Sequence, residues 1–269
     1  MTTVSYHLHH EGRDYALQYV HTNEADAIAD QNDRGTLAIV EPIDVDQRCY
    51  GVYTASPVEK HSTEAANLTN YDTDDKYLID SVLSIFDVID DEQDLVWYKP
   101  LEPNQIAEAL DRVEWRQAVP VVGGQLLSNL ILAHGLPNAN HRTALGFLNA
   151  YLATIAPSFE PPETTTADNE WVGWIDEYIT DSKRLLTLTT NPRLFTWLAE
   201  HGATQIERKD GIKIRLDEYE ITGDDPWADL STAHEQLSVD FVRKYLEQAN
   251  IESLTERRDD GKKAFISRL

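Results

Sequence analysis

The segment from Ala133 to Arg142 (AHGLPNANHR) combines residue types that can handle a phosphate-bearing group. An apolar helical pattern ends at His134, Gly135 and Pro137 interrupt it, and a second helical pattern begins with Asn138 as its expected N-cap. The loop is short, so we expect the His134 side chain to overlook the first backbone N–H groups of the second helix. An imidazole in that position could act as a general base beside an anion-binding site.

Three backbone amides and one arginine form the expected anion site. The N–H groups of Ala139, Asn140 and His141 have no intrahelical partner at a helix start, and the small Ala139 side chain lets a phosphate approach the backbone. Arg142 lies one turn into the helix and adds a planar positive fork. These parts suffice to move a phosphate-bearing group onto a hydroxyl. The spacing alone also allows a structural role, in which the histidine is favoured by a helix dipole and the asparagine only caps a helix.

Helices with one apolar face are expected on both sides of this loop. In the first of them, Leu78, Ile79, Val82, Leu83 and Phe86 recur at helical spacing. This helix begins at Lys76 and ends before the polar run Asp90–Gln93. A further helical pattern begins near Pro103 and runs through Ile106, Leu110, Val113 and Trp115. Others begin at Pro120 (ending at His134) and at about Ala139 (carrying Leu145, Leu148, Leu152 and Ile155), and cover Glu170–Leu186, Arg193–His201 and Ser231–Gln248.

Strand patterns lie outside this helical region. They cover Arg13–Val20, Thr36–Val40 and Cys49–Thr54, and a hairpin is expected over Thr204–Ile221 with its turn at Asp210 and Gly211. The polar run Pro57–Asp75 has no periodicity and indicates a linker. The patterns predict a β-bearing N-terminal appendage with linker (1–75), a helical core (76–200) and a C-terminal α/β extension (201–269), and therefore a mainly α fold.

The composition limits the classes of function. The 47 acidic and 23 basic residues give a formal net charge of −24, which favours a salt-loving source because molar salt screens the self-repulsion. Such a charge argues against nucleic-acid binding. No apolar run approaches the ~18 residues needed to cross a membrane, and no secretory signal pattern occurs, so we expect a cytoplasmic protein without a membrane partner. Cys49, the single cysteine, is expected to be a small core residue in a strand.

The stretch HGLPNANHRTAL, from His134 to Leu145, resembles the active-site loop of the Fic/Doc family. The family signature is H-x-F-x-(D/E)-G-N-(G/K)-R-x-x-R, and the stretch is closer to the Doc branch, which reads H-x-F-x-(D/E)-A-N-K-R-T-A-L. The matching residues are His134, Ala139, Asn140, Arg142, Thr143, Ala144 and Leu145. The resemblance covers about Lys76 to Glu200. It implies a Fic-type helical bundle there, with small mixed α/β additions at both ends.

The resemblance also implies an activity. Members of the family use ATP or a related nucleotide with Mg²⁺ to transfer phosphate or AMP to a Ser, Thr or Tyr hydroxyl of a protein. His134 would be the general base. Ala139, Asn140 and His141 would form the anion hole through their N–H groups, with the Asn140 amide added, and Arg142 would bind the β and γ phosphates.

Four positions depart from the family pattern. Leu136 replaces a buried Phe, and His141 replaces the usual Lys or Gly. Asn138 replaces the acid that coordinates Mg²⁺, and its neutral amide oxygen is a weaker metal ligand. Leu145 stands where AMP-transferring members have a second Arg, which favours the protein kinase activity of the Doc branch over AMP transfer.

Two further family features were sought in the sequence. Asp94–Pro100 is a candidate for the flap that aligns the target segment by strand addition, and equally for a core strand or loop. The inhibitory pattern (S/T)-x-x-x-E-(G/N) has no strict copy: Glu11 lacks the Ser or Thr, and Ser231–Gln236 ends in Gln. We therefore expect any restraint to come from a separate antitoxin-like partner.

Two alternative functions stay open. The chain could be a catalytically degenerate family member that binds a nucleotide or a protein without turnover, for which Asn138 is the main support, or the toxin of a toxin–antitoxin pair. Two metal sites were also considered: His7, His9 and His10 could place two imidazoles on one face of a strand, and His134 and His141 could be ligands together.

Overall fold

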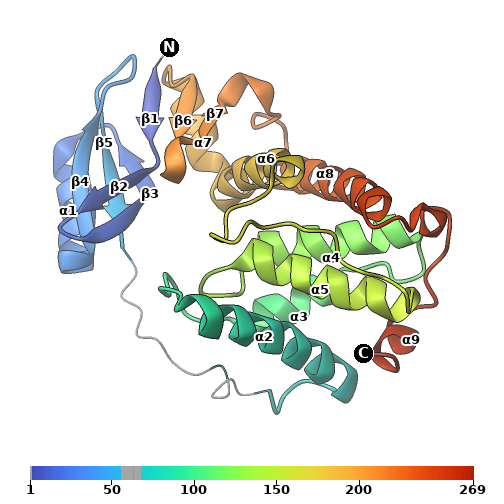
Figure 1. Cartoon of the computed structure of the whole chain (residues 1–269). Coiled ribbons are helices and arrows are strands. Elements are labelled where there is room, and N and C mark those ends of the chain that lie inside the picture. The colour runs from blue at the N-terminus through green and yellow to red at the C-terminus, as the bar shows by residue number, and fades with distance from the viewer. Residues whose placement is uncertain (1, 56–62, 64–67) are drawn as a thin grey trace. The chain divides into compact units, whose positions relative to one another are not determined.

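The computed structural model (Figure 1) describes residues 2–55, 63 and 68–269, and the chain forms two compact units. The sheet unit comprises Met1–Pro57 and Lys183–Thr232, and the helical unit comprises Val58–Ser182 and Ala233–Leu269. Each unit is built from two separate stretches of chain. The expected consecutive segments 1–75, 76–200 and 201–269 therefore do not follow the compact units. The expected linker, Pro57–Asp75, lies largely outside the described residues.

The sheet unit contains two β-sheets. Its strands are β1 (Thr3–Ser5), β2 (His7–His10), β3 (Arg13–His21), β4 (Ala38–Ile43), β5 (Cys49–Thr54), β6 (Gln205–Glu207) and β7 (Lys213–Arg215). One sheet has the order β2-β3-β5-β4 and is antiparallel throughout. The other has the order β1-β6-β7, in which β1 runs parallel to β6 and β6 antiparallel to β7. The pairing of β1 with β6 joins the two chain stretches of this unit.

Helices α1 (Glu24–Arg34) and α7 (Pro192–Glu200) complete the sheet unit, together with short 3-10 turns at Gly35–Leu37, Lys209–Gly211 and Leu216–Glu218. α1 packs on the four-stranded sheet through a small cluster of Ala27, Ala38 and Val52. The sequence analysis did not predict α1, because Ala27 is its single buried residue and most of its surface is polar. Its start is nevertheless marked by Asn23, whose side chain accepts a hydrogen bond from the Asp26 amide.

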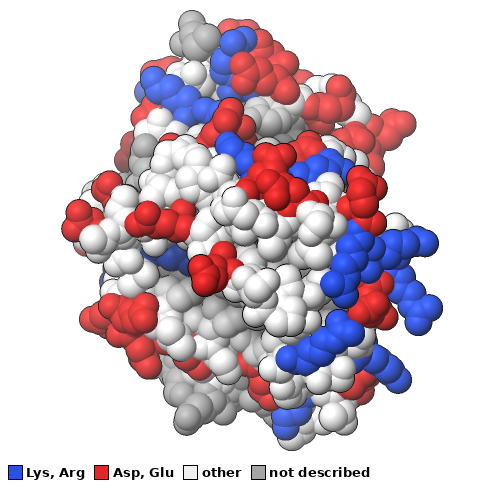
Figure 2. Space-filling model, turned by 45° about the vertical axis from the view of Figure 1, so that its right-hand side comes forward, with Lys and Arg blue, Asp and Glu red and all other residues white. Residues whose placement is uncertain are grey.

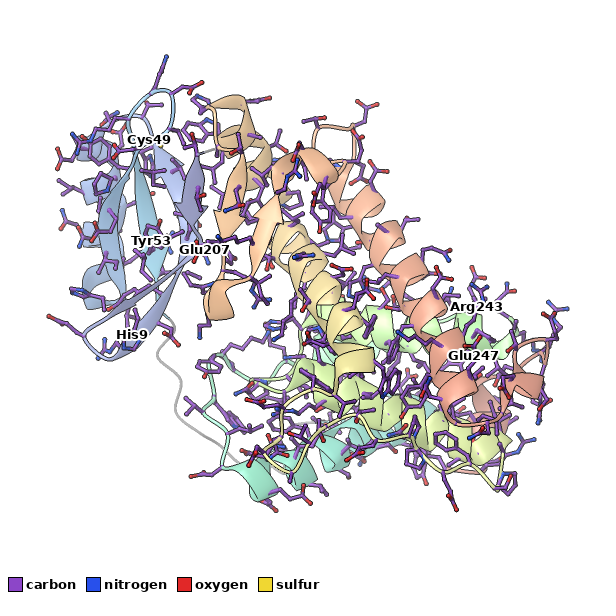
Figure 3. All side chains as sticks on the ribbon, turned by 45° about the horizontal axis from the view of Figure 1, so that its top comes forward. His9, Cys49, Tyr53, Glu207, Arg243 and Glu247 are labelled. Carbon is purple, nitrogen blue, oxygen red and sulfur yellow. The ribbon has the colours of Figure 1, made fainter. Side chains whose placement is uncertain are left out.

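The predicted strands are confirmed in this unit, except that Thr36 and Leu37 lie in a 3-10 turn and β4 begins at Ala38. The stretch Cys49–Thr54 is β5 as expected, and Cys49 is a buried, free thiol on it, as Figure 3 shows together with Tyr53. Strands β6 and β7 form the predicted hairpin, with Gly211 at positive φ in the connection. Strand β1, which pairs with β6 in parallel, was not predicted, because three residues are too few to show an alternation of apolar and polar side chains.

The helical unit surrounds the His134–Arg142 segment. Its helices are α2 (Thr73–Gln93), α3 (Pro103–Asp111), α4 (Val119–Ala133), α5 (Asn140–Ile155) and α9 (Lys262–Ile266), with a 3-10 turn at Glu252–Leu254. α6 (Gly173–Thr190) and α8 (Pro226–Gln248) each cross the boundary between the units. α4 packs against α3 and α5, and α2 packs against α3, α5 and α9.

The apolar faces predicted for these helices are confirmed. All five positions predicted for α2 are buried, and the predicted faces of α4 and α5 form the core between them. Two predicted ends were wrong. α2 continues through Asp90–Gln93 because buried Asp90 accepts hydrogen bonds from the Leu95 amide and the Trp97 indole, and α3 stops at Asp111.

The predicted fold class was wrong. Helix makes up 54% of the structure and strand 15%, in two sheets, so the fold is mixed α/β and not a mainly α bundle with small additions. The strands that periodicity revealed are part of a compact unit with its own core, in which segments from both ends of the chain pair. Within the described residues, none of the helices is both long enough and apolar enough to cross a membrane.

Gly124 marks a close approach of α4 and α8. A Cβ built at this position would lie 2.7 Å from both the Cα and the N of Val239, so the backbones of α4 and α8 touch there. Real Cβ atoms do not come this close to a backbone, and the backbone cannot move aside as a flexible side chain would. The contact therefore requires glycine.

We predict that Gly124→Ala lowers the free energy of unfolding by about 3 kcal/mol or more, because overpacking forces α4 and α8 apart. The matched control is Gly173→Ala at the start of α6, where an added Cβ meets no atom within 4 Å. Urea unfolding of both variants is the measurement. Equal stability of the two variants would contradict the assigned α4–α8 contact.

Candidate functional site

Two left-handed residues define the loop between α4 and α5. His134 ends α4 at φ 51° and ψ 36°, and Ala139 precedes α5 at φ 51° and ψ 24°. Non-glycine residues rarely adopt positive φ, and it costs free energy at each position. His134 is exposed, whereas Gly135, Leu136 and Pro137 between the two residues are buried. The loop thus turns sharply at both ends and keeps its middle inside the unit.

Hydrogen bonds from the preceding segment hold the loop from one side. The Glu102 amide donates to the Gly135 carbonyl (2.8 Å), and the Tyr98 amide donates to the Pro137 carbonyl (3.1 Å). Gly135 also packs tightly, since an added Cβ would lie 2.8 Å from the Ile106 side chain. Leu136 is 4% exposed, so it is buried as the Phe of the Fic/Doc pattern would be.

The Asn140 side chain holds the loop from the other side. Its Nδ2 donates to the Leu136 carbonyl (3.1 Å), and its Oδ1 accepts from the Leu136 amide (3.2 Å). The side-chain amide of buried Asn140 is therefore used to fix the loop, so it does not join the anion hole in the way the resemblance implied. Its backbone N–H remains at the first position of α5.

The start of α5 has no side-chain cap. Asn138 was predicted to be the N-cap, but the cap position is held by Ala139, which has no capping side chain. The first N–H groups of α5, on Asn140, His141 and Arg142, have no acceptor within the helix itself. The partial positive charge of the helix start is thus not offset by a capping oxygen.

Asn138 does not fit the role of a metal ligand. Its Oδ1 accepts from the Ala139 amide within the loop (2.6 Å), and its Nδ2 donates to the Val96 carbonyl (2.8 Å). Both polar ends of the side chain are therefore bonded, and the second bond links the loop to the segment before α3. In the described ranges, no three His, Cys, Asp or Glu side chains come together as a metal site. The residues present therefore do not fit a protein-bound Mg²⁺ here, and we derive no chemical step through that ion.

Among the described residues, the groups that contact the Arg142 guanidinium are neutral. Its guanidinium donates to the Gln93 side chain and to the Asn169 carbonyl (2.8 Å), and it lies 5.7 Å from the centre of the Trp171 ring. Among the described residues no carboxylate pairs with it, and its Nε is buried without a hydrogen-bond partner. Burial lowers the pKa of Arg142, which reflects the cost of holding this charge without a counter-charge. An anion at this place would relieve that cost.

His141 turns its ring into the core. Its Nε2 lies 2.9 Å from Ser182 Oγ, which lies 2.7 Å from His234 Nε2, and His234 Nδ1 lies 2.8 Å from Ser128 Oγ. This His141–Ser182–His234–Ser128 chain links α5, α6, α8 and α4. Burial lowers the pKa of His234 to about 3, so this ring is neutral and has one N–H. One serine must then donate to it and the other must accept from it.

Sequence reasoning missed this buried chain. The serines and His234 lie far apart in sequence, on helix faces that were expected to pack as ordinary core. The one available signal was a histidine within the otherwise apolar face of α8, and it was considered only as part of the near-miss Ser231–Gln236. In the structure, Glu235 of that stretch accepts from Gln125 Nε2 (3.0 Å), so its contact is with α4 and not with Arg142. Glu11, the other near-miss, lies in the turn between β2 and β3.

The flap candidate Asp94–Pro100 lies beside the loop as an extended segment without regular strand pairing. Trp97 is buried, whereas Val96 and Tyr98 are 64% and 49% exposed. The alternation of exposed and buried side chains agrees with the extended character expected from the sequence, and the segment is neither a core strand nor part of a sheet.

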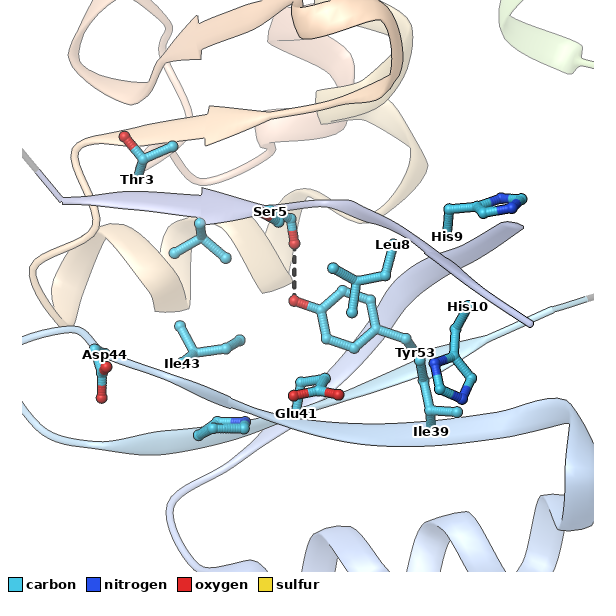
Figure 4. A pocket seen from close by; sticks show the side chains of 12 residues that line it. Thr3, Ser5, Leu8, His9, His10, Ile39, Glu41, Ile43, Asp44 and Tyr53 are labelled. Carbon is cyan, nitrogen blue, oxygen red and sulfur yellow. Dashed lines mark hydrogen bonds between the residues drawn. The ribbon is translucent and has the colours of Figure 1, made fainter. Parts of the chain in front are cut away.

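The sheet unit contains the other candidate groups. His9 pairs with Asp14 (3.0 Å) and His10 lies 3.8 Å from Glu11, so the two imidazoles have separate carboxylate partners and form no metal site. A cavity of about 390 Å³ opens between β4 and the β1–β2 segment (Figure 4). Its wall includes Tyr53, whose hydroxyl donates to the Ser5 carbonyl (2.8 Å) and whose pKa is raised by burial and by Glu41. This cavity lies in a different unit from His134 and Arg142.

Comparison with known proteins gave one match. A family model described as "Family of unknown function (DUF8172)" matches residues 1–269, so the chain belongs to this family. Neither the curated proteins nor the solved structures gave a match.

We predict that Asn140→Ala destabilises the protein by about 2 kcal/mol, because it leaves the buried Leu136 N–H and carbonyl without partners. The measurement is the free energy of unfolding in urea. Gln236→Ala, which removes an exposed amide from α8, is the control and should change stability by no more than about 0.5 kcal/mol. An Asn140→Ala variant as stable as this control would show that the side-chain amide does not hold the loop.

The depressed pKa of His234 predicts a pH-dependent stability. The unfolded chain binds one more proton than the folded protein between pH 6.5 and the folded pKa of about 3. The contribution of neutral His234 is therefore complete above pH 6.5 and is lost as the pH falls toward 3. Relative to His234→Asn, the wild type should lose about 2 kcal/mol of stability between pH 7 and about pH 5. Parallel pH profiles of the two proteins would contradict a buried neutral imidazole, and Gln236→Ala should follow the wild type.

Proposed function

We propose that the chain is a nucleotide-dependent transferase that modifies a protein hydroxyl, with phosphoryl transfer from ATP favoured over AMP transfer. The observation that carries the proposal is the combination, within nine residues, of exposed His134, the uncapped start of α5 and the uncompensated charge of Arg142. Each group alone is common. Together they offer a base, an amide-lined anion site and a cation in one short segment.

The hydrogen bonds that hold the His134–Arg142 segment support the assignment of an anion site. The loop is fixed through Gly135, Leu136 and Pro137, and the start of α5 has no capping side chain. A site whose donors are oriented before binding loses little free energy to reorganisation. We assign the N–H groups of Ala139, Asn140 and His141 to the nucleotide phosphates, with the first of them shared with Asn138 Oδ1. Arg142 would give up its hydrogen bonds to the Gln93 side chain and the Asn169 carbonyl and would bind the β and γ phosphates in their place.

In the proposed reaction, the target hydroxyl oxygen attacks phosphorus while its proton passes to His134. Attack at the γ phosphorus breaks the bond to ADP, and attack at the α phosphorus breaks the bond to pyrophosphate. Leu145 is 5% exposed within α5, where AMP-transferring Fic proteins have a second arginine, and this supports transfer of the γ phosphate. The proposal assigns no protein ligand to Mg²⁺, so any metal would arrive on the phosphates of ATP.

The proposed substrate is a Ser, Thr or Tyr hydroxyl in an extended protein segment, and Asp94–Pro100 beside the loop is the proposed place for it. Its exposed Val96 and Tyr98 side chains support this assignment. We further propose a cytoplasmic location and control by a separate antitoxin-like protein, since Glu235 in the candidate inhibitory stretch contacts Gln125 and not the arginine.

A second candidate is binding without turnover, which the engagement of Asn138 favours. Active Fic/Doc proteins have a metal-binding acid at the position of Asn138. Here Asn138 bonds to the Val96 carbonyl and to the Ala139 amide. Such a protein would bind ATP through α5 and Arg142 and transfer nothing.

We predict that His134→Ala lowers label transfer from ATP to protein by about 10² to 10⁴, as expected for loss of a general base. The assay uses γ- and α-labelled ATP in molar KCl, with candidate partner proteins from a matching lysate. Transfer of γ label alone supports the kinase, and transfer of α label supports the AMP transferase. His10→Ala, an exposed imidazole of the sheet unit, is the control and should transfer label as the wild type does.

Two outcomes would count against the transferase. If neither label is transferred but ATP binds, and Arg142→Gln weakens that binding, the protein is a nucleotide-binding module. If ATP does not bind at all, the assignment of the α5 start and Arg142 is wrong.

A further inference from the structure

Basic side chains are few in this chain, and they are unevenly placed. Figure 2 shows Lys and Arg gathered on parts of a surface that otherwise carries scattered acids. One stretch of 12 residues near the C-terminus of the chain, 257–268, contains five of the 23 basic residues. They are Arg257, Arg258, Lys262, Lys263 and Arg268. A local excess of this kind in a chain of net charge −24 needs a physical explanation.

This stretch closes a cavity in the helical unit, separate from the His134 loop. The cavity has a volume of about 520 Å³ and is lined by Glu114, Trp115, Arg116, Gln117, Asp260, Gly261, Lys262 and Lys263. That size is within the range of small-molecule sites. Its two walls are the segment between α3 and α4 and the segment that leads into α9.

Backbone and side-chain hydrogen bonds hold the two walls together. The Val119 amide donates to the Arg257 carbonyl (2.8 Å), and the Asp259 amide donates to the Gln117 carbonyl (2.9 Å). Between these bonds, Ala118 and Arg258 form an antiparallel β-bridge. The half-buried Asp259 carboxylate then accepts from Tyr151 (3.0 Å) and from the Gly261 amide (2.6 Å). The cavity is therefore held in shape without a ligand.

Both acids of the cavity lining have hydrogen-bond partners. Asp260 pairs with Arg268 (2.8 Å), and Glu114 accepts from Gln117 (2.8 Å). Lys262 pairs with Asp75 and Asp111 outside the cavity wall. Two cations of the lining, Arg116 and Lys263, have no carboxylate partner among the described residues, and both are exposed. The lining thus has two cations without a described ion-pair partner, Arg116 and Lys263, against one carboxylate, Glu114, that bonds to a neutral amide, which leaves an excess of one positive charge.

Arg116 lies over a position that requires glycine. Gly261 has φ 103°, and a Cβ added there would lie 3.5 Å from Arg116 Nε. The arginine stem therefore packs closely on the Gly261 backbone, and its head remains at the cavity.

One residue of the lining, Trp115, has an unsatisfied hydrogen-bond donor. Trp115 is 8% exposed, its ring stacks on Phe265 of α9 at 5.4 Å, and its Nε1 is buried with no hydrogen-bond partner. A buried donor without an acceptor costs about 1 to 3 kcal/mol. Solvent does not reach this N–H in the empty cavity, so an acceptor of a ligand that moves the lining aside and bonds to it would recover the cost.

We propose that this cavity binds a small organic anion with a flat apolar body, such as an aromatic carboxylate or phosphate ester. The anionic group would contact Arg116 and Lys263, an acceptor of the ligand would take the Trp115 N–H, and the apolar body would lie against the indole ring and the aliphatic stems of the basic side chains. The site is independent of the proposed transferase, because it shares no residue with the His134 loop.

The test is calorimetric titration of the full chain with three probes that share one apolar body: naphthoate, naphthyl phosphate and the neutral naphthamide. We expect both anions to bind at least about tenfold more tightly than the amide, since a charge-assisted hydrogen bond contributes about 1.5 to 3 kcal/mol. The tighter of the two anions identifies the carboxylate or the phosphate as the natural group. Equal binding of the amide, or no binding of any probe, would overturn the proposal.

Variants test the assigned contacts. Arg116→Gln and Lys263→Gln should each weaken anion binding, and the double variant should weaken it by about tenfold or more without affecting the amide. Arg112→Gln is the matched control, because Arg112 is exposed in the same segment and does not line the cavity. Trp115→Phe keeps a ring on Phe265 but removes the N–H, and it should weaken binding several-fold.

Unchanged binding in the double variant would overturn the assignment of the two cations, and unchanged binding in Trp115→Phe would overturn that of the indole. Each variant is accepted only if its urea unfolding transition matches the wild type. Label transfer from ATP should stay the same in all of them, so failure here and failure of the transferase can be told apart.

Discussion

The hydrogen bonds between the Asn140 side chain and the Leu136 backbone are the interaction on which the candidate site depends. They fold the six-residue connection His134–Ala139 back on the start of α5 and permit positive φ at both ends of it. Without them, the N–H groups of α5 would have no fixed relation to the end of α4. Asn138, Tyr98 and Glu102 add contacts from the other side, so the loop is held by several weak bonds and not by one strong one.

The site also reflects the electrostatics of a very acidic chain. Long-range repulsion would keep a triphosphate away from a protein of net charge −24 at low salt, and molar salt shortens that repulsion to about 3 Å. Only short contacts can then select an anion. Arg142, with neutral partners, is placed to do so, whereas Arg215 and Arg243 are each paired with an acid.

Local sequence signals predicted much of the helical unit and little of its long-range organisation. The buried faces of α2, α4 and α5, the burial of Cys49, and the strands β3 and β5 follow from periodicity and residue type. The pairing of β1 with β6 and the His141–Ser182–His234–Ser128 chain do not, because they join residues that only the tertiary structure brings together. For the same reason the role of Asn140 was misassigned. A side chain that can bind a phosphate can also bind its own backbone, and the sequence does not decide between the two.

The parallel pairing of β1 with β6 has a consequence for how the protein is made. Thr3 pairs with Gln205, so β1 leaves the ribosome about 200 residues before its partner is synthesised. During that time its edge is open to other chains, and the contacts that close it carry a large loop-closure entropy. Assembly of the sheet unit is therefore expected to come after the α2–α5 helices have formed, and to set the pace of folding.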